Sequence, residues 1–433
     1  MKNLKLVTLG IQHLLAMYAG AILVPLIIGN ALGFDSTQLT YLVSIDIMMC
    51  GIATLLQVVR GKVFGIGLPI VLGCTFTAVA PIIAIGKEFG LSAIYGSVIA
   101  SGIIVVLIAS FFGKLVRFFP PVVTGSVVTI IGITLIPVAI NNMGGGVGAK
   151  DFGSASNIAL AFGTLITIVL IYRFTKGFAR AISILIGLVL GTIAAILMDK
   201  VDFTPVIEAD FLQMVQPFYF GTPTFHWEPI ITMTLVALVS LVESTGSYFA
   251  LSDICKQPVT EKDLARGYRS EGLASIIGGL FNSFPYTAFS QNVGLLQMTG
   301  VRTRNVIFIT GGFLVTLGFL PKVAALTTII PTPVLGGAMI AMFGMVIAQG
   351  IKMLSTTINQ SEGNSMIIAC AIGMGLGVTV VPDIFNILPS SLKILTSNGI
   401  VAGSITAIVL NIIFNMIPWR RERSNGELED QKA

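Results

Sequence analysis

Long apolar stretches, separated by short polar connections, follow one another along nearly the whole chain of 433 residues. Most of them approach the roughly 20 residues that an α-helix needs to cross a bilayer. Their starts lie near Leu9, Thr40, Phe64, Ser92, Phe118, Asn157, Ala181, Pro229, Glu271, Tyr286, Asn305, Pro333, Ser365 and Gly399. The pattern predicts an all-α polytopic membrane protein with 14 segments, of which the third and tenth are too interrupted to be plain helices.

Composition and loop charge support this class. Hydrophobic residues make up 55% of the chain and charged residues 10%, which excludes a soluble globular protein. With the amino terminus inside, 14 segments place 20 of the 25 Lys and Arg residues on the inner side, where such residues concentrate. We therefore predict that both termini are cytoplasmic. The net charge of +5 follows from this bias and indicates no nucleic-acid partner.

The termini and the cysteines indicate no cleaved signal, disulfide or metal site. The first apolar stretch is of full length and lacks a small-residue cleavage site, so we interpret it as a retained helix. The charged tail, residues 419–433, is expected to be disordered. Cys50, Cys74, Cys255 and Cys370 show no disulfide or metal-site spacing, and no cofactor is predicted.

The two interrupted segments resemble each other. Pro69 lies six residues before Thr75, and Pro285 lies six residues before Gln291. The offset of 216 is close to half of the chain. Two halves of seven segments each must be inverted with respect to the membrane, so we expect the interrupted segments to meet near its midplane.

Polar residues gather in the tenth segment. Residues 291–300 place two amide side chains and two glycines in an otherwise apolar sequence, after a β-like run at residues 284–290. Polar groups at membrane depth usually mark a substrate path. Alternatively, the side chains of Gln291 and Asn292 hydrogen-bond the freed backbone groups of the broken segment. Phe76 and Phe289 either stack on an aromatic ligand, beside the small Thr75, or pack in the lipid zone.

Four ionisable side chains lie within predicted segments: His13, Asp46, Glu243 and Glu271. A carboxylate at that depth needs a partner, a proton or a wet cavity. A carboxyl that takes up and releases protons is what a proton-coupled carrier requires.

Each of these groups also has a structural interpretation. Glu243 could hydrogen-bond a neighbouring helix, and His13 could be a satisfied core histidine. Glu271 could stabilise a first helical turn and pair with Arg266 or Arg269. Asp46 could cap or link segments.

At these residues the chain resembles the nucleobase-ascorbate transporter family over essentially its whole length. The family signature, Gln/Glu-Asn-x-Gly-x4-Thr-Gly/Arg/Lys, stands here as Gln291-Asn292-Val293-Gly294 followed by Thr299-Gly300. The Gln12-His13 pair, Glu243 and Glu271 also fit the family. Within it, the chain is most similar to bacterial xanthine permeases, with uric acid permeases next.

The resemblance implies an architecture. It has 14 segments in two inverted sets of seven, and segments 3 and 10 each contribute a short strand. A core domain comprises residues 1–115 and 228–331, and a gate domain comprises residues 116–200 and 332–418. Residues 201–227 form an extracellular connection, and residues 419–433 a cytoplasmic tail.

It also implies roles for individual residues. Glu243 and Gln291 contact the nucleobase, with Thr75, Phe76, Phe289, Asn292 and His13 shaping the site. Glu271, with Glu243, supports proton coupling. Gln291, where uracil permeases carry Glu, favours a purine dione.

The function expected from this resemblance is proton-coupled uptake of xanthine across a bacterial plasma membrane, by a homodimer embedded in lipid. A uric acid:proton symporter is the alternative. A nucleobase channel is a further alternative from another class, although the polar groups converge on one site rather than on a ring of charges. An enzyme is not expected, because neither His13 nor His226 has a nucleophile or metal-ligand spacing around it.

Overall fold

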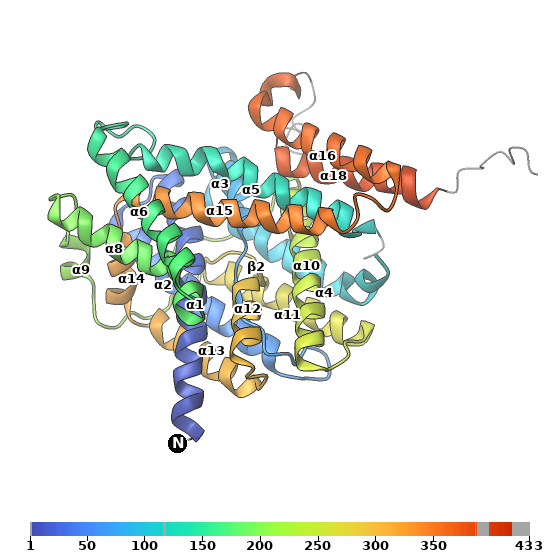
Figure 1. The fold of residues 1–433 in the computed structure, drawn as a ribbon, viewed down its shortest axis with the longest axis horizontal. Helices are drawn as coiled ribbons and strands as arrows, with labels where there is room; N and C mark the ends of the chain where they lie inside the picture. Colours follow the sequence, from blue (N-terminus) through green and yellow to red (C-terminus); the bar gives the residue numbers. More distant parts are fainter. Residues whose placement is uncertain (1, 116–117, 386, 388–397, 418–433) are drawn as a thin grey trace, which may run out of the picture.

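The computed structural model describes residues 2–115, 118–385, 387 and 398–417 (Figure 1). The predicted tail at residues 419–433 lies outside these ranges. The amino-terminal half comprises α1 (Lys2–Leu32), α2 (Ser36–Val58), β1 (Leu72–Cys74), η1 (Phe76–Ala78), α3 (Val79–Phe89), α4 (Leu91–Leu115), α5 (Pro121–Met143), α6 (Ala155–Phe174), α7 (Phe178–Ala181), α8 (Ser183–Leu197) and α9 (Thr204–Glu208). The second half comprises α10 (Trp227–Cys255), α11 (Glu261–Leu280), β2 (Tyr286–Ala288), α12 (Ser290–Thr299), α13 (Arg304–Gly318), α14 (Pro321–Thr328), α15 (Thr332–Ser355), α16 (Glu362–Val380), η3 (Pro382–Phe385), α18 (Gly399–Asn411) and η4 (Ile412–Met416).

Nine helices in the described ranges are long and apolar enough to cross a membrane. The count rises to ten if α13 and α14, which meet at an angle of 81°, form one bent span. By this measure the chain is a multi-pass membrane protein. The predicted segments that fall outside the count are short, as α3, α8 and α12 are, or charged, as α11 is with six ionisable residues.

Most helices begin within a few residues of the predicted starts, but the helix of the ninth segment begins well before its predicted start. This helix, α11, begins at Glu261, ten residues before Glu271. The reason is a capping box, in which the Thr260 hydroxyl accepts from the N–H of Asp263 and the Asp263 carboxylate accepts from the N–H of Thr260. The interpretation of Glu271 as a first-turn residue is therefore wrong, since it lies in the middle of the helix.

The two interrupted segments contain the predicted short strands, and β1 pairs with β2 in antiparallel orientation. Leu72 lies opposite Ala288, and Gly73 lies opposite Thr287. Hydrogen bonds on either side extend the ladder, from the N–H of Thr75 to Pro285 and from the N–H of Phe289 to Val71, each at 3.0 Å. A pair of broken segments thus satisfies its backbone inside the protein, as a membrane environment requires.

The strands themselves are 214 positions apart in the chain, since β1 begins at Leu72 and β2 at Tyr286. The two prolines are 216 positions apart, because Pro69 lies three residues before its strand and Pro285 only one.

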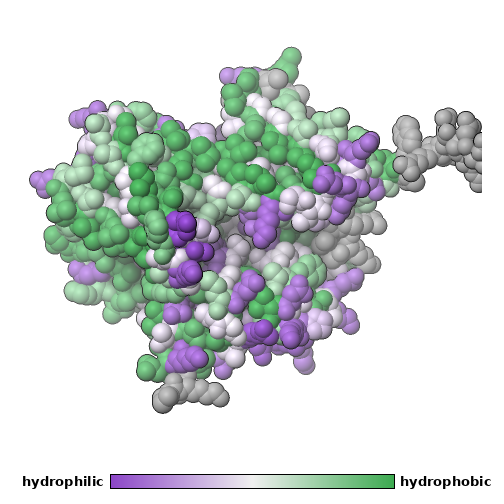
Figure 2. All heavy atoms as spheres, in the orientation of Figure 1, coloured by the Kyte–Doolittle hydropathy of each residue, from purple (hydrophilic) through white to green (hydrophobic). Residues whose placement is uncertain are grey.

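The helices pack mainly in two groups. In one, α5 lies along α15, with α6 and α8 on one side and α16 and α18 on the other (Figure 1). In the other, α4 packs on α10 and α11, while α1, α2 and α13 pack together around the strand pair. Figure 2 shows that hydrophilic residues gather over the lower part of this face, below the mostly hydrophobic upper helices.

Helices α4 and α11 approach each other at glycines. A Cβ atom on Gly102 would lie 2.7 Å from the carbonyl oxygen of Gly272, and one on Gly272 would lie 2.8 Å from the carbonyl oxygen of Gly102. Small residues permit this backbone contact, on which packing of helices in lipid depends.

Substitution Gly102→Ala is expected to destabilise the protein by about 1–3 kcal/mol, because the new methyl group would meet a backbone atom that cannot move by itself. Thermal unfolding of the purified protein in detergent would show a lower melting temperature. Gly246→Ala is the matched control, since a Cβ there meets nothing within 4 Å. Equal melting temperatures for the two variants would contradict the close packing of α4 and α11.

Candidate functional site

A cavity of about 290 Å³ lies where α12 begins. One wall comes from Phe76, from Glu243 on α10 and from residues 287–291 of β2 and α12. The opposite wall comes from the other helix group, with Val128 on α5 and Met342, Met345, Val346 and Gln349 on α15. The cavity therefore lies between the two groups of helices, beside the strand pair.

Several polar side chains in this cavity are free to bind a ligand, Glu243 and Gln291 among them. Glu243 is partly exposed and Gln291 is exposed, and neither forms a hydrogen bond or ion pair with any other residue that the structure describes. The side chain of the N-cap residue of α12, Phe289, accepts no hydrogen bond from the first N–H groups of the helix. The first N–H groups of α12 therefore add donors, and the positive end of the helix dipole, to the same wall.

Aromatic rings bound the cavity. Phe289 is 4% exposed, and a Cβ atom on Gly73 would lie 2.4 Å from its ring, so only glycine at position 73 admits the ring there. Phe76 packs edge to face on Phe343, with ring centroids 5.9 Å apart. The rings of Phe76 and Phe289 line the cavity and provide flat apolar surface for a planar ligand.

Asn292 and His13 lie behind the cavity, not in its lining. Both side chains are buried. The Asn292 amide donates to the His13 carbonyl oxygen at 2.9 Å, and its nitrogen lies 3.1 Å from Nδ1 of His13. The amide thus ties α12 to α1 rather than to the broken backbone of its own segment.

Thr75 is also outside the cavity lining and is fully buried. Its hydroxyl accepts from the N–H of Thr77 at 3.3 Å and so caps η1. Ser240 on α10 donates to the same oxygen at 3.3 Å. Thr75 fixes the first interrupted segment against α10.

Glu271 is 2% exposed and lies in a buried polar chain. It accepts a hydrogen bond from the hydroxyl of Tyr248, and that hydroxyl accepts one from the amide of Gln57. The second carboxyl oxygen, Oε2, has no partner among the described residues. Tyr248 and Glu243 lie on the same helix, α10, so this chain adjoins the cavity wall.

The ion pair considered for Glu271 is wrong. Arg266 pairs with Asp263, and Arg269 donates to Ser110. Both arginines therefore have partners other than Glu271.

Sequence reasoning missed Tyr248 as the partner of Glu271, and Gln57 as the partner of Tyr248. Each is a polar residue within an apolar stretch, and that signal was available. Their meeting depends on how α2, α10 and α11 pack.

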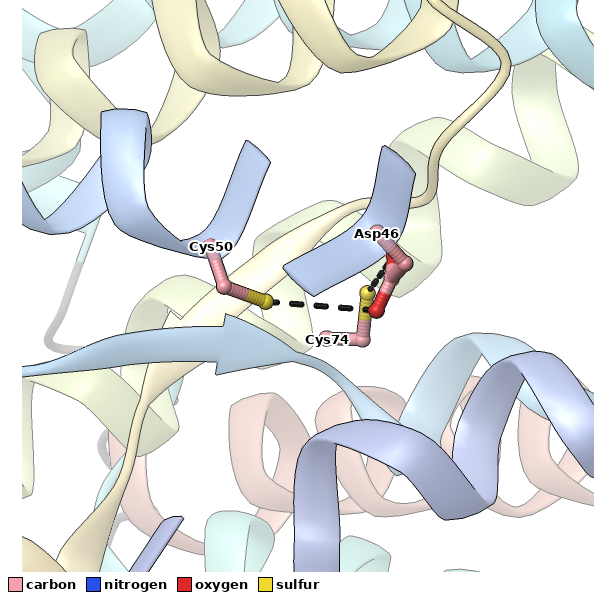
Figure 3. Close-up of side chains that lie close together, drawn as sticks. All are labelled: Asp46, Cys50 and Cys74. Carbon is pink, nitrogen blue, oxygen red and sulfur yellow. Dashed lines mark hydrogen bonds between the residues drawn. The ribbon is translucent and has the colours of Figure 1, made fainter. Parts of the chain in front are cut away.

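Asp46 holds together a second buried cluster, shown in Figure 3. Its Oδ1 accepts from the Cys74 thiol at 2.6 Å and from the Ser283 hydroxyl at 2.6 Å, and Cys50 lies 3.9 Å from Oδ2. The donor atoms of Asp46, Cys50 and Cys74 lie within 4.8 Å of one another, a grouping that sequence spacing did not reveal. Because these contacts join α2, β1 and the approach to β2, they agree with the linking role considered for Asp46.

Comparisons with known proteins agree with this geometry. A family model described as "Permease family" (Xan_ur_permease) matches residues 4–384. The chain belongs to the nucleobase-ascorbate transporter family. It is a permease and not an enzyme.

Individual relatives cover nearly the whole chain. A xanthine permease of Bacillus subtilis is 64% identical over 99% of this chain and 98% of its own length. The uric acid permease PucK of the same organism is 61% identical over 95% of this chain and 96% of its own length. The nucleobase transporter PlUacP of Paenibacillus larvae is 61% identical over all of both chains.

Solved structures share the fold at low sequence identity. The transmembrane domain of the cyanobacterial bicarbonate transporter BicA matches with a TM-score of 0.64 and 16% identity, over 92% of this chain and 98% of that domain. SLC26A9 matches with a TM-score of 0.61 and 11% identity, over 93% of this chain and 65% of its own.

Proposed function

We propose that this chain imports xanthine together with protons across the plasma membrane of a bacterium. The observation that carries the proposal is the pair of unpartnered polar groups, Glu243 and Gln291, on one wall of a cavity bounded by aromatic rings. The names of the relatives, a xanthine permease and a uric acid permease among them, support a purine as the substrate.

The chemistry of the cavity suits an oxopurine. Xanthine presents ring N–H donors beside carbonyl acceptors. An ionised Glu243 accepts from such a donor, while the Gln291 amide both donates and accepts along the same edge. A buried polar group left unpaired costs about 1–3 kcal/mol, which is enough to reject a base with the wrong edge.

Uric acid is the second candidate, since it differs from xanthine by one carbonyl on the imidazole ring. Glu243 and Gln291 would hydrogen-bond the pyrimidine-dione edge, which xanthine and uric acid share, so they would bind both molecules equally well.

The wider architecture belongs to the same proposal. Fourteen segments form two inverted sets of seven, with both termini cytoplasmic. Residues 1–115 and 228–331 form the core domain and residues 116–200 and 332–418 the gate domain, joined by an extracellular connection at 201–227. Two chains assemble as a homodimer in the lipid. Dense packing within the two helix groups, with the cavity between them, supports this division.

Transport then proceeds by movement of the core domain against the gate domain. The core group carries Glu243 and Gln291, and the gate group covers them with α5 and α15. Glu271 exchanges the coupling proton. Support comes from its burial, its unpartnered oxygen and its link through Tyr248 to the helix that holds Glu243.

Uptake of labelled xanthine into cells that express the protein tests the proposal directly. Accumulation should collapse when a protonophore is added, because the proton gradient drives it. Unlabelled xanthine and uric acid should compete, and uracil should not. Accumulation that survives the protonophore and requires sodium would contradict proton coupling, and competition by uracil alone would contradict the purine site.

Substitution Glu271→Gln should separate binding from transport. The amide keeps the shape and still accepts from Tyr248, but it cannot take up a proton near neutral pH. Xanthine should bind the purified variant with unchanged affinity, while uphill uptake is lost. Glu362→Gln, an exposed carboxyl at the start of α16, is the control. Simultaneous loss of binding would make Glu271 a ligand or a structural anchor instead.

Substitution Gln291→Glu should weaken xanthine binding by about 1.4 kcal/mol or more, which is tenfold or more in Kd. A carboxylate only accepts hydrogen bonds, so a carbonyl that met the amide N–H would face a negative charge. Binding isotherms on purified protein measure the effect, with the exposed Gln360→Glu as control. Equal affinities of wild type and Gln291→Glu would remove Gln291 from the site.

A further inference from the structure

A second cavity, of about 340 Å³, adjoins the proposed substrate cavity. The two share Phe289 and Gln291 on one side and Met342 and Met345 on the other. The second cavity extends away from Glu243, along α12, to the short helix α7 and the start of α8. Helix α7 contacts α12 directly, so the helix that begins at the substrate cavity also forms a wall of this one.

The lining of the second cavity is mostly apolar, apart from Arg180, Ser183, Gln291, Gln297 and the hydroxyl of Tyr172. Gly294 also lines it, and a Cβ atom there would meet nothing within 4 Å. No packing contact therefore demands glycine at this position. Its missing side chain leaves space in the cavity.

Arg180 is partly buried and lacks an acidic partner. Its Nε donates to the carbonyl oxygen of Thr175 at 3.0 Å, and its guanidinium lies 5.2 Å from the ring centroid of Tyr172. Within the described ranges, no carboxylate comes within ion-pair distance of it. These contacts hold the guanidinium plane in place and leave its terminal nitrogens without a partner among the described residues.

A fixed, unpaired guanidinium in a largely apolar cavity favours the binding of an anionic ligand. Its planar array of N–H groups matches two adjacent acceptor atoms on a flat ligand, and the apolar surroundings strengthen the attraction. At neutral pH uric acid carries a negative charge, whereas xanthine is mostly neutral. The two oxopurines therefore differ in charge at neutral pH, which is the property that a guanidinium at Arg180 would distinguish.

We propose that the second cavity is an antechamber to the substrate site in which Arg180 binds an oxopurine in its anionic form, and that it favours urate over xanthine. The proposal rests on the proposed function of the first cavity. In the proposed topology the connection between α6 and α8 is cytoplasmic, so the antechamber lies on the inner side. Gln291, which lines both cavities, is where the ligand passes from one to the other.

Direct equilibrium binding to the purified protein tests this. Labelled urate or labelled xanthine is titrated onto the protein at neutral pH, for the wild type and for Arg180→Gln, Arg180→Lys and Arg173→Gln. Arg173 is the matched control, because it lies at the end of α6, stacks on Phe174 at 5.8 Å and lines neither cavity. Counterflow from proteoliposomes loaded with urate or with xanthine provides a second measurement.

With Arg180→Gln, the Kd for urate should rise about fivefold or more, because a charge-assisted contact is lost, while the Kd for xanthine changes less than twofold. Arg180→Lys should recover most of the urate affinity, and Arg173→Gln should match the wild type. In counterflow, Arg180→Gln should slow urate exchange selectively. An equal change for both ligands, or no change for either, would overturn the antechamber. A wild type that binds neither ligand would instead contradict the proposed function.

Discussion

Two strands of three residues each, buried at the centre of the protein, are the feature on which the other parts of the site depend. A membrane interior offers no water to a broken helix, so the freed N–H and C=O groups of both interrupted segments must find partners within the protein. The pairing of β1 with β2 provides them, and the register brings Gly73 against Thr287. Because only a glycine at position 73 leaves room for the ring of Phe289, the same pairing also shapes the cavity.

The polar residues around the strands divide into two kinds. Asp46, Thr75 and Asn292 are buried and use their hydrogen bonds on neighbouring elements, so they hold the strands and half-helices in place. Glu243 and Gln291 face the cavity without partners. In the proposed site the first kind provides rigidity and the second provides the groups that bind, because a group already satisfied inside the protein has little left to offer a ligand.

Charge adds a further distinction between the two cavities. Glu243 lies at one end of the joined cavities and Arg180 at the other, with Gln291 between them. The end with the carboxylate suits a ligand that donates hydrogen bonds, and the end with the guanidinium suits one that carries negative charge. A purine that can lose a proton is able to satisfy both in turn.

The sequence by itself determined the membrane class, the approximate starts of most helices, the interruption of two segments and the polar signature at Gln291. These are local properties, since twenty apolar residues, a proline or an amide in an apolar stretch has the same meaning wherever the chain runs. Tertiary structure alone decided the pairing of Gly73 with Thr287, the placement of Thr75 and Asn292 behind the cavity, the partnership of Glu271 with Tyr248, and the position of Arg180 beside α12. Each of these joins residues far apart in the chain. Such contacts depend on the relative placement of whole helices, which hydrophobic patterning does not fix, because nearly every face of these helices is apolar whether it meets protein or lipid.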